Sequence, residues 1–505
     1  MRECVRTAKC VAALLVFLTP WAAIRGQSVH PIASSDPPTC WDAASGDWSQ
    51  DANWSGGEPT ADLDAYVGST AGPTSAGVTI TQAGEACRVL HLGKGDDAQG
   101  SLTIEPGGTL TAAGVVVGHN GTGTVVQKGG ACTVVFLDVG YGDDPDLTGL
   151  PMSNGYYELL DGTVTAEAIT ITRGDAMFGR FTQHAGRVET NYLEVGGANP
   201  GEYLMKGGTL INTGWLIMQD MSSHFEQWGG SHRTVRIELL FAPYVKHGGD
   251  LVVTDGFSVL DGSVFRQDDG NTHVQGDVSV RKMATFALRG GSVRVDGNLL
   301  VAQENSPSPE LELLSTDGAL TVGGTLTLRG EVNVQCALGA QIRLTAPGFV
   351  NEMPETAGAA GGLANLTLVF EAGADRVATC EAAGEDRGPD PNGFLDNHAI
   401  GTLCIGGEED VGRVLLVDDF ENAAGDALPE AVYVEHLVVQ PGCTLDLNGL
   451  NLYYLTGGAD PGATVVFSGG SLTRVPEPAT FALLALGGLA VLRRRQSGAE
   501  PPGAG

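Results

Sequence analysis

The sequence predicts an all-β fold, a parallel β-solenoid (β-helix), because short β-rich runs end in glycine, recur near a 22-residue period and show no helical spacing of apolar residues. A clear unit is Gly107-Gly108-Thr109-Leu110, followed by Gly114-Val115-Val116-Val117-Gly118 and by Gly123-Thr124-Val125-Val126-Gln127. The unit returns at Gly207-Gly208-Thr209-Leu210. Corner glycines at 108, 130, 186, 208 and 230 are 22, 56, 22 and 22 residues apart. Three strands per turn are therefore expected.

Stacking explains why such a chain folds. One turn cannot bury its few apolar side chains alone, but stacked turns pair their backbones at roughly 4.8 Å and bring inward side chains together. Glycine permits the positive φ that a sharp corner requires. A β-sandwich with glycine-rich hairpins is the alternative fold. Gln127, Gln183 and Gln227 each lie three residues before a corner glycine, and in register their amides would form a hydrogen-bonded ladder.

Composition excludes several classes of function. The 505 residues carry a net charge of −32 and 74 glycines, which favours an exported soluble protein over one that binds nucleic acid or anionic lipid. Seven cysteines outside the leader (40, 87, 132, 336, 380, 404 and 443) form no Cys-x-x-Cys pair, which argues against zinc. A Cys380–Cys404 disulfide is one candidate after export.

The N-terminus predicts a signal peptide over residues 1–26. Arg2, Arg6 and Lys9 precede the apolar stretch Val11–Leu18, and small residues follow up to Gly26. This apolar stretch is too short to span a membrane. The mature chain is therefore expected to be exported.

Three tryptophans follow, within a region 40–100 that we interpret as an N-terminal cap and first rung. Trp41, Trp48 and Trp54 lie in a compact segment that resembles the opening of bacterial surface proteins with autotransporter-type or PEP-CTERM-type β-strand repeats. Amphipathic indoles suit the cap that an open solenoid end needs. The alternative is a carbohydrate contact, in which sugar rings stack on these indoles.

Residues 101–356 are interpreted as the solenoid repeats and residues 363–474 as a second, acidic β-rich region. Within the latter, Asp386, Asp390, Asn392 and Asp396 surround a Pro-Asn-Gly turn. Calcium prefers such oxygen ligands, although the full calcium-loop pattern and its terminal Glu are missing. A calcium site and a solvated acidic loop are therefore both open.

Two carboxylates occupy equivalent strand positions. Asp138 and Glu194 each precede a closing Val-Gly, between apolar neighbours that point inward. With one rung between them they would lie roughly 10 Å apart on one outer face, near the range of an inverting glycosidase. The simpler interpretation is a pair of solvated surface residues with no partner base or arginine nearby in sequence.

The C-terminal segment 475–496 carries the most specific motif. Pro476-Glu477-Pro478 is followed by the apolar run Ala479–Leu492, expected to be a short transmembrane helix, and by Arg493-Arg494-Arg495. This order resembles the PEP-CTERM sorting signal. The resemblance implies recognition at the Pro-Glu-Pro motif by an exosortase-type membrane enzyme, removal of the apolar end and delivery to the cell surface.

Independently of that resemblance, the three arginines favour a cytoplasmic distal end before processing. An ordinary tail anchor is the alternative.

Together these features predict a non-enzymatic, exported protein of the cell surface or extracellular matrix, with no cofactor other than the candidate calcium. The resemblance associates such proteins with exopolysaccharide and biofilm. Two other functions remain open: a β-helix polysaccharide lyase or glycoside hydrolase, and a carbohydrate-binding module.

Overall fold

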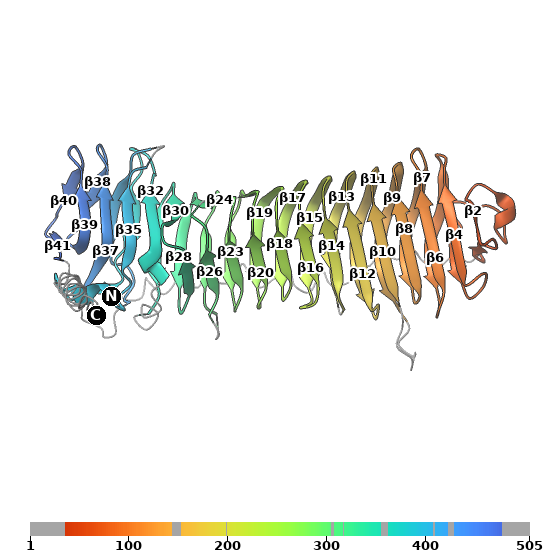
Figure 1. Ribbon diagram of the computed structural model, residues 1–505, viewed down its shortest axis with the longest axis horizontal. Coiled ribbons are helices and arrows are strands. Elements are labelled where there is room, and N and C mark those ends of the chain that lie inside the picture. Colours follow the sequence, from red (N-terminus) through yellow and green to blue (C-terminus); the bar gives the residue numbers. More distant parts are fainter. Residues whose placement is uncertain are drawn as a thin grey trace, which may run out of the picture.

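The protein is a rod built from stacked β-coils (Figure 1). The computed structural model describes residues 36–143, 153–197, 199–304, 308–316, 318–354, 362–407, 410–422 and 429–476. About 18 turns of solenoid form two parallel sheets. The signal peptide and the predicted C-terminal helix lie outside the described residues.

The larger sheet has 28 strands and runs the length of the rod. Its strands are β1 (Thr39–Cys40), β3 (Ala65–Ser69), β5 (Glu85–Lys94), β7 (Thr109–His119), β9 (Ala131–Gly142), β11 (Thr163–Gly174), β13 (Arg187–Val195), β15 (Thr209–Gln219), β17 (Ser231–Leu240), β19 (Asp250–Leu260), β21 (Asn271–Val274), β22 (Val278–Arg281), β24 (Ser292–Val295), β25 (Leu299–Ala302), β27 (Ala319–Val322), β28 (Thr325–Arg329), β30 (Ala340–Leu344), β31 (Gly348–Glu352), β32 (Leu366–Phe370), β33 (Ala378–Glu381), β34 (Gly384–Glu385), β35 (Ile400–Ile405), β36 (Arg413–Val417), β37 (Glu430–Val439), β38 (Thr444–Asp446), β39 (Asn451–Ala459), β40 (Thr464–Val466) and β41 (Ser471–Arg474).

The smaller sheet has 13 strands and ends at β29. Its strands are β2 (Ser45–Asp47), β4 (Ser75–Ile80), β6 (Gln99–Ile104), β8 (Thr122–Gln127), β10 (Asn154–Leu159), β12 (Phe178–Gln183), β14 (Gly201–Met205), β16 (His224–Gln227), β18 (Pro243–Lys246), β20 (Val264–Gln267), β23 (Thr285–Leu288), β26 (Glu310–Leu313) and β29 (Asn333–Cys336). Three 3-10 turns complete the described elements: η1 (Asp51–Asn53), η2 (Gly362–Asn365) and η3 (Pro391–Phe394).

Parallel pairing between successive coils confirms the predicted solenoid. Thr209 pairs with Ser231 and Ser231 with Asp250, so each coil lies directly on the one before. The alternative β-sandwich is wrong, since its hairpins would pair strands in antiparallel fashion. Two of the three predicted runs merge into one bent strand in most early coils, as β7 shows for Thr109–His119. In the coil after β19 the two runs are separate strands: β21 and β22 both pair with that single long strand.

The corner glycines form a column along the rod. Gly186, Gly208 and Gly230 adopt φ of 72°, 78° and 74°. A Cβ on Gly208 would lie 2.5 Å from the Gly186 carbonyl oxygen, and one on Gly230 would lie 2.4 Å from the Gly208 oxygen. Both the left-handed φ and the close approach exclude a side chain here. The predicted positive φ is therefore confirmed at Gly130, Gly186, Gly208 and Gly230. In the first predicted corner it falls on Gly107, with φ of 92°, and not on Gly108.

Aromatic rings stack through the interior beneath the smaller sheet. Successive rings from Tyr157 to Tyr244 have centroids 4.5–5.0 Å apart and lie within 12° of parallel: Tyr157, Phe181, Tyr203, Phe225 and Tyr244. Every one of these side chains is at most 1% exposed. This packed stack lies within a core whose other buried side chains are mainly Val, Leu and Ile.

The predicted glutamine ladder is wrong. Leu159 lies in register between Gln127 and Gln183, and Met205 lies between Gln183 and Gln227, so the glutamines are two coils apart. Their amides are too far apart to bond one another.

Each glutamine instead serves the corner beside it. Gln183 is fully buried, and its Nε2 donates to the carbonyls of Gly186 at 3.3 Å and Thr209 at 3.1 Å. Its Oε1 accepts from the Tyr203 hydroxyl at 2.8 Å. Gln127 bonds Tyr157 in the same manner, and Gln227 bonds Tyr244. Each glutamine thus accepts the hydrogen bond of one buried tyrosine hydroxyl, and these tyrosines are every second ring of the stack.

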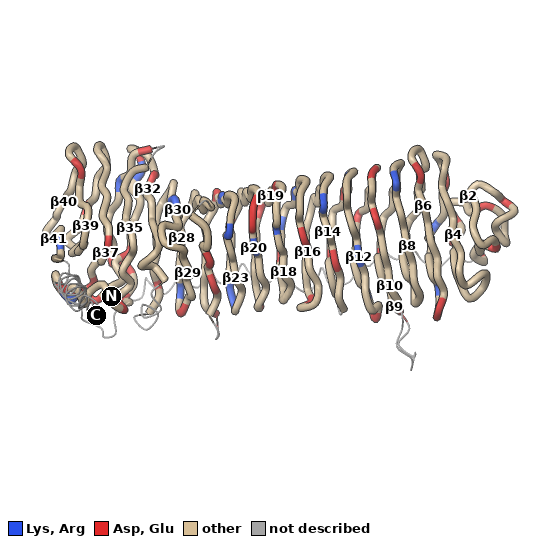
Figure 2. The backbone as a smooth tube through the Cα atoms, viewed as in Figure 1, with Lys and Arg blue, Asp and Glu red and all other residues tan. Residues whose placement is uncertain are grey.

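The acidic region beyond residue 363 continues the same solenoid. Its strand β32 pairs in parallel with β30 on one side and β35 on the other. The larger sheet therefore passes through the proposed boundary, while the smaller sheet ends before it. Charged residues of both signs are scattered along the length of the rod (Figure 2).

The cysteines do not cross-link the coils. The seven in the described residues are free, so the candidate Cys380–Cys404 disulfide is not formed. Cys380 stacks in register with Phe349 and Leu416, whereas Cys404 stacks with Val369 and Val438. The two thiols belong to different side-chain columns.

The corner column predicts a graded response to alanine. Gly84→Ala introduces only an unfavourable φ, since no atom lies within 4 Å of its Cβ position, and should lower the free energy of unfolding by roughly 1–2 kcal/mol. Gly208→Ala adds a collision and should cost more. Gly256→Ala meets nothing closer than 3.9 Å and should stay within about 0.5 kcal/mol. Urea unfolding followed by circular dichroism measures all three; equal midpoints for Gly208→Ala and Gly256→Ala would contradict the column.

The Gln183–Tyr203 pair predicts a coupled loss. Gln183→Met leaves a buried hydroxyl without its acceptor and should cost roughly 1–3 kcal/mol of unfolding free energy. Tyr203→Phe should then cost nothing further in the Gln183→Met background. Gln99→Met, at an exposed position, is the matched control. Additive losses in a double-mutant cycle would show that the two side chains do not act as a unit.

Candidate functional site

The Pro-Glu-Pro segment leaves the rod directly from its last strand. After β41, the Val475 N–H donates to the Tyr454 carbonyl at 2.8 Å. The Val475 side chain is fully buried in a small apolar cluster with Tyr433 and Tyr453. Pro476 comes next and is exposed. The motif therefore begins one residue beyond a fixed anchor.

Comparison with protein families bears on this same segment. The PEP-CTERM protein-sorting motif matches residues 474–496, beginning at the last residue of β41. The chain carries a PEP-CTERM sorting signal. This signal implies processing by an exosortase, and it implies export and sorting to the cell surface. Searches of curated proteins and of solved structures find no match.

Most of the sorting signal lies outside the described residues. This holds for Glu477, Pro478 and the three arginines Arg493, Arg494 and Arg495, whose assignment rests on the sequence and the family match. The residues that are described include no helix with the length and apolar character needed to cross a membrane. The match covers the signal alone, so the autotransporter-type repeat stays a prediction.

The three N-terminal indoles pack against one another at the other end of the rod. Trp54 makes edge-on contacts with Trp41 and Trp48, with ring centroids 4.9 and 5.0 Å apart. The Trp54 Nε1 donates to the Trp48 carbonyl at 2.8 Å, and no indole is more than 4% exposed. A sugar ring has no open face on which to stack, so this arrangement speaks against the carbohydrate contact and fits the cap.

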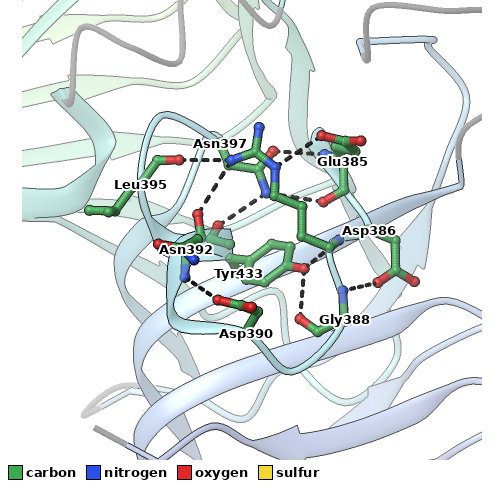
Figure 3. Close-up of polar contacts among 10 residues, drawn as sticks. Glu385, Asp386, Gly388, Asp390, Asn392, Leu395, Asn397 and Tyr433 are labelled. Carbon is green, nitrogen blue, oxygen red and sulfur yellow. Dashed lines mark hydrogen bonds and ion pairs between the residues drawn. The ribbon is translucent and has the colours of Figure 1, made fainter. Parts of the chain in front are cut away.

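The acidic loop after β34 is held by an arginine (Figure 3). Arg387 donates from Nε to Glu385 at 2.9 Å and from Nη1 to the carbonyls of Asn392 at 3.3 Å and Leu395 at 3.1 Å. The Arg387 N–H donates to the Tyr433 hydroxyl at 2.8 Å, and that hydroxyl donates to the Gly388 carbonyl at 3.0 Å. A guanidinium and a tyrosine thus organise the loop.

The candidate calcium ligands do not converge. Asp386 accepts from the Gly388 N–H and from Asn451, while Asp390 caps η3 by accepting from the Asn392 N–H. Asp396 sits at a separate turn with φ of 52°. No group of three or more acidic, histidine or cysteine side chains fit to hold a metal occurs in the described ranges. The calcium interpretation therefore gains no support. Asp386 and Asp390 already accept hydrogen bonds from backbone N–H groups and, for Asp386, from the Asn451 side chain.

Asp138 and Glu194 lie on one outer face with one coil between them, as predicted. Both pair in register with Thr170 of β11, which places them roughly 10 Å apart along the rod. Asp138 was expected to be solvated, but it is only 1% exposed. Arg173, on the adjacent strand β11, brings Nη1 to 3.4 Å from the Asp138 Oδ2. No arginine is close to Asp138 in the sequence, but the fold brings Arg173 next to it.

Polar neighbours also surround Glu194. The Tyr192 hydroxyl donates to Glu194 at 3.3 Å, and Gln219 Nε2 donates to it at 3.3 Å. Burial raises the pKa of Asp138 to about 6, partly offset by Arg173, and burial also raises the pKa of Glu194. These carboxyls therefore hold protons more readily than solvated ones. We name Asp138, Arg173, Tyr192, Glu194 and Gln219 the carboxylate cluster.

Sequence reasoning missed several of these residues. Arg173 lies 35 positions from Asp138, and Tyr433 lies 46 positions from Arg387, so no local motif joins them. To predict the contact between Arg173 and Asp138, one would need the register of the two coils on either side of the segment 144–152. The repeat does not specify the length of that segment. Val475 had a signal, since it is an apolar residue just after an alternating strand.

Proposed function

We propose that this protein is a structural rod of the cell surface or extracellular matrix, delivered by an exosortase-type system and associated with exopolysaccharide or biofilm. The observation that carries the proposal is the sorting signal joined without a spacer to the last coil of a solenoid. Delivery of a rod to the surface is useful in itself, because a stacked solenoid gives length and stiffness.

The interior supports a mechanical role. Its aromatic stack and buried glutamines make contacts between successive coils. The side chains that fill the interior are at most a few per cent exposed. The excess of acidic residues keeps the exterior hydrated and discourages nonspecific collapse. Autotransporter-type repeats would suit the same role.

The sorting step gives the first test of this proposal. Glu477→Ala should abolish C-terminal processing and surface display, because the only charged group of the Pro-Glu-Pro motif is lost. Asp460→Ala, an exposed change in the last coil, should leave both intact. Immunoblots of cell fractions from an exosortase-containing host measure size and location. Normal processing of Glu477→Ala would contradict the assignment.

The carboxylate cluster favours a second candidate function, that of a carbohydrate-active β-helix enzyme. It places two carboxyls two coils apart, with β11 between them, beside an arginine and a tyrosine on an outer sheet face. Such spacing is close to that of inverting glycosidases. The limited exposure of Asp138 favours a structural ion pair instead, and we retain the rod as the leading proposal.

A polysaccharide panel separates these candidates. The rod proposal expects no new reducing or unsaturated ends from neutral or acidic polysaccharides. Release that falls at least 100-fold in Asp138→Asn and Glu194→Gln, but persists in Glu167→Gln, would establish the enzyme. Glu167 is an exposed residue of β11, the strand between the two carboxyls, and serves as the control. Retention without cleavage would instead identify a binding module.

A further inference from the structure

The two ends of the rod are finished differently. At the N-terminal end, the segment with Trp41, Trp48 and Trp54 covers the first coil, and the Trp48 N–H donates to the Thr79 carbonyl of β4 at 2.8 Å. At the C-terminal end, β40 pairs only with β38, and β41 only with β39. No described strand pairs with their outer edges. Such an edge presents unpaired N–H and C=O groups that favour addition of another strand.

Columns of apolar side chains run into this open edge. Val432, Leu452 and Leu472 stack in register, and Leu452 is fully buried while Leu472 is only partly buried. Leu445 likewise is fully buried, whereas Val465, stacked on it, is not. We call the partly buried inward residues of the last two coils the open end; they are Leu450, Tyr454, Ala463, Val465 and Leu472. A further coil would bury them as the preceding ones are buried.

The open end is nearly neutral in a strongly acidic protein. From residue 441 to residue 475, Asp446, Asp460 and Arg474 are the only charged side chains, although the whole chain carries −32. Figure 2 shows the last strands largely free of charged residues. Two copies of this protein would repel each other along most of their length but not here.

The chain itself limits what can cover this surface. The apolar run Ala479–Leu492 starts four residues after Val475, within roughly 14 Å of extended chain. Before processing, this run is therefore close enough to compete with a second copy for the open end. The sorting signal implies processing by an exosortase, and we take this processing to remove the apolar run. After removal, an identical open end on a second copy offers edge strands of the same length and an apolar surface of the same shape.

We propose that the open end is a self-association surface whose occupant is a second copy of this chain. Two rods related by a two-fold axis pair their last coils edge to edge in antiparallel fashion and bury both apolar surfaces. The N-terminal caps block further growth, so the product is a dimer of doubled length rather than a fibre. Removal of the apolar run frees the surface, which couples assembly to processing.

The decisive experiment uses the chain that ends at Pro478 and lacks the signal peptide, studied by sedimentation equilibrium and by small-angle X-ray scattering. We expect a dimer about twice as long as one rod. Val465→Lys and Leu472→Lys should each weaken dimerisation at least tenfold, since they place a charge on the buried surface. Val377→Lys, at a residue 50% exposed outside the last coil, is the control and should dimerise normally.

Each other outcome overturns the proposal. A monomer at all concentrations shows that no second copy binds, and species that keep growing show that the N-terminal cap does not block assembly. A dimer unaffected by Val465→Lys and Leu472→Lys lies elsewhere on the rod. Circular dichroism confirms that both variants fold. None of these outcomes depends on whether Glu477→Ala blocks sorting, so the two proposals fail separately.

Discussion

Backbone pairing at the glycine corners is the constraint on which the rest of the rod depends. The Gly162, Gly186 and Gly208 carbonyls each accept an N–H from the following coil at 2.8–3.0 Å. That approach leaves no room for a Cβ, and the turn needs a left-handed φ. The corner thus sets the spacing between coils, and the spacing sets which side chains meet inside.

The interior adapts to this spacing with a two-coil rhythm. Coils are about as far apart as two stacked aromatic rings, so Tyr and Phe alternate along one column in face-to-face contact. A buried tyrosine hydroxyl needs a partner, and the glutamine of the coil before supplies it. The same glutamine satisfies corner carbonyls, which ties the polar network to the glycine column. Core packing and corner geometry are therefore one structural device.

The ends of the rod carry its links to the outside. One end is closed by indoles that the coil stack buries, and the other passes through Val475 into the sorting signal. Val475 directly precedes the Pro-Glu-Pro motif, so the motif that the exosortase recognises begins beside the exposed last coil. The carboxylate cluster lies between the two ends, on the side of the rod, where the register of β9, β11 and β13 places its carboxyls.

Local patterns in the sequence determined the solenoid and the sorting signal, because glycine spacing, strand alternation and the Pro-Glu-Pro order are each read within a few tens of residues. They could not determine contacts between coils. The Arg173–Asp138 pair, the Arg387–Tyr433 loop and the offset of Gln127 from Gln183 all depend on the register of stacked strands. Insertions of irregular length between strands change that register, so the register is known only once the backbone of the folded chain is known. The tertiary structure therefore decided which polar groups share a site, and whether the indoles face solvent or the core.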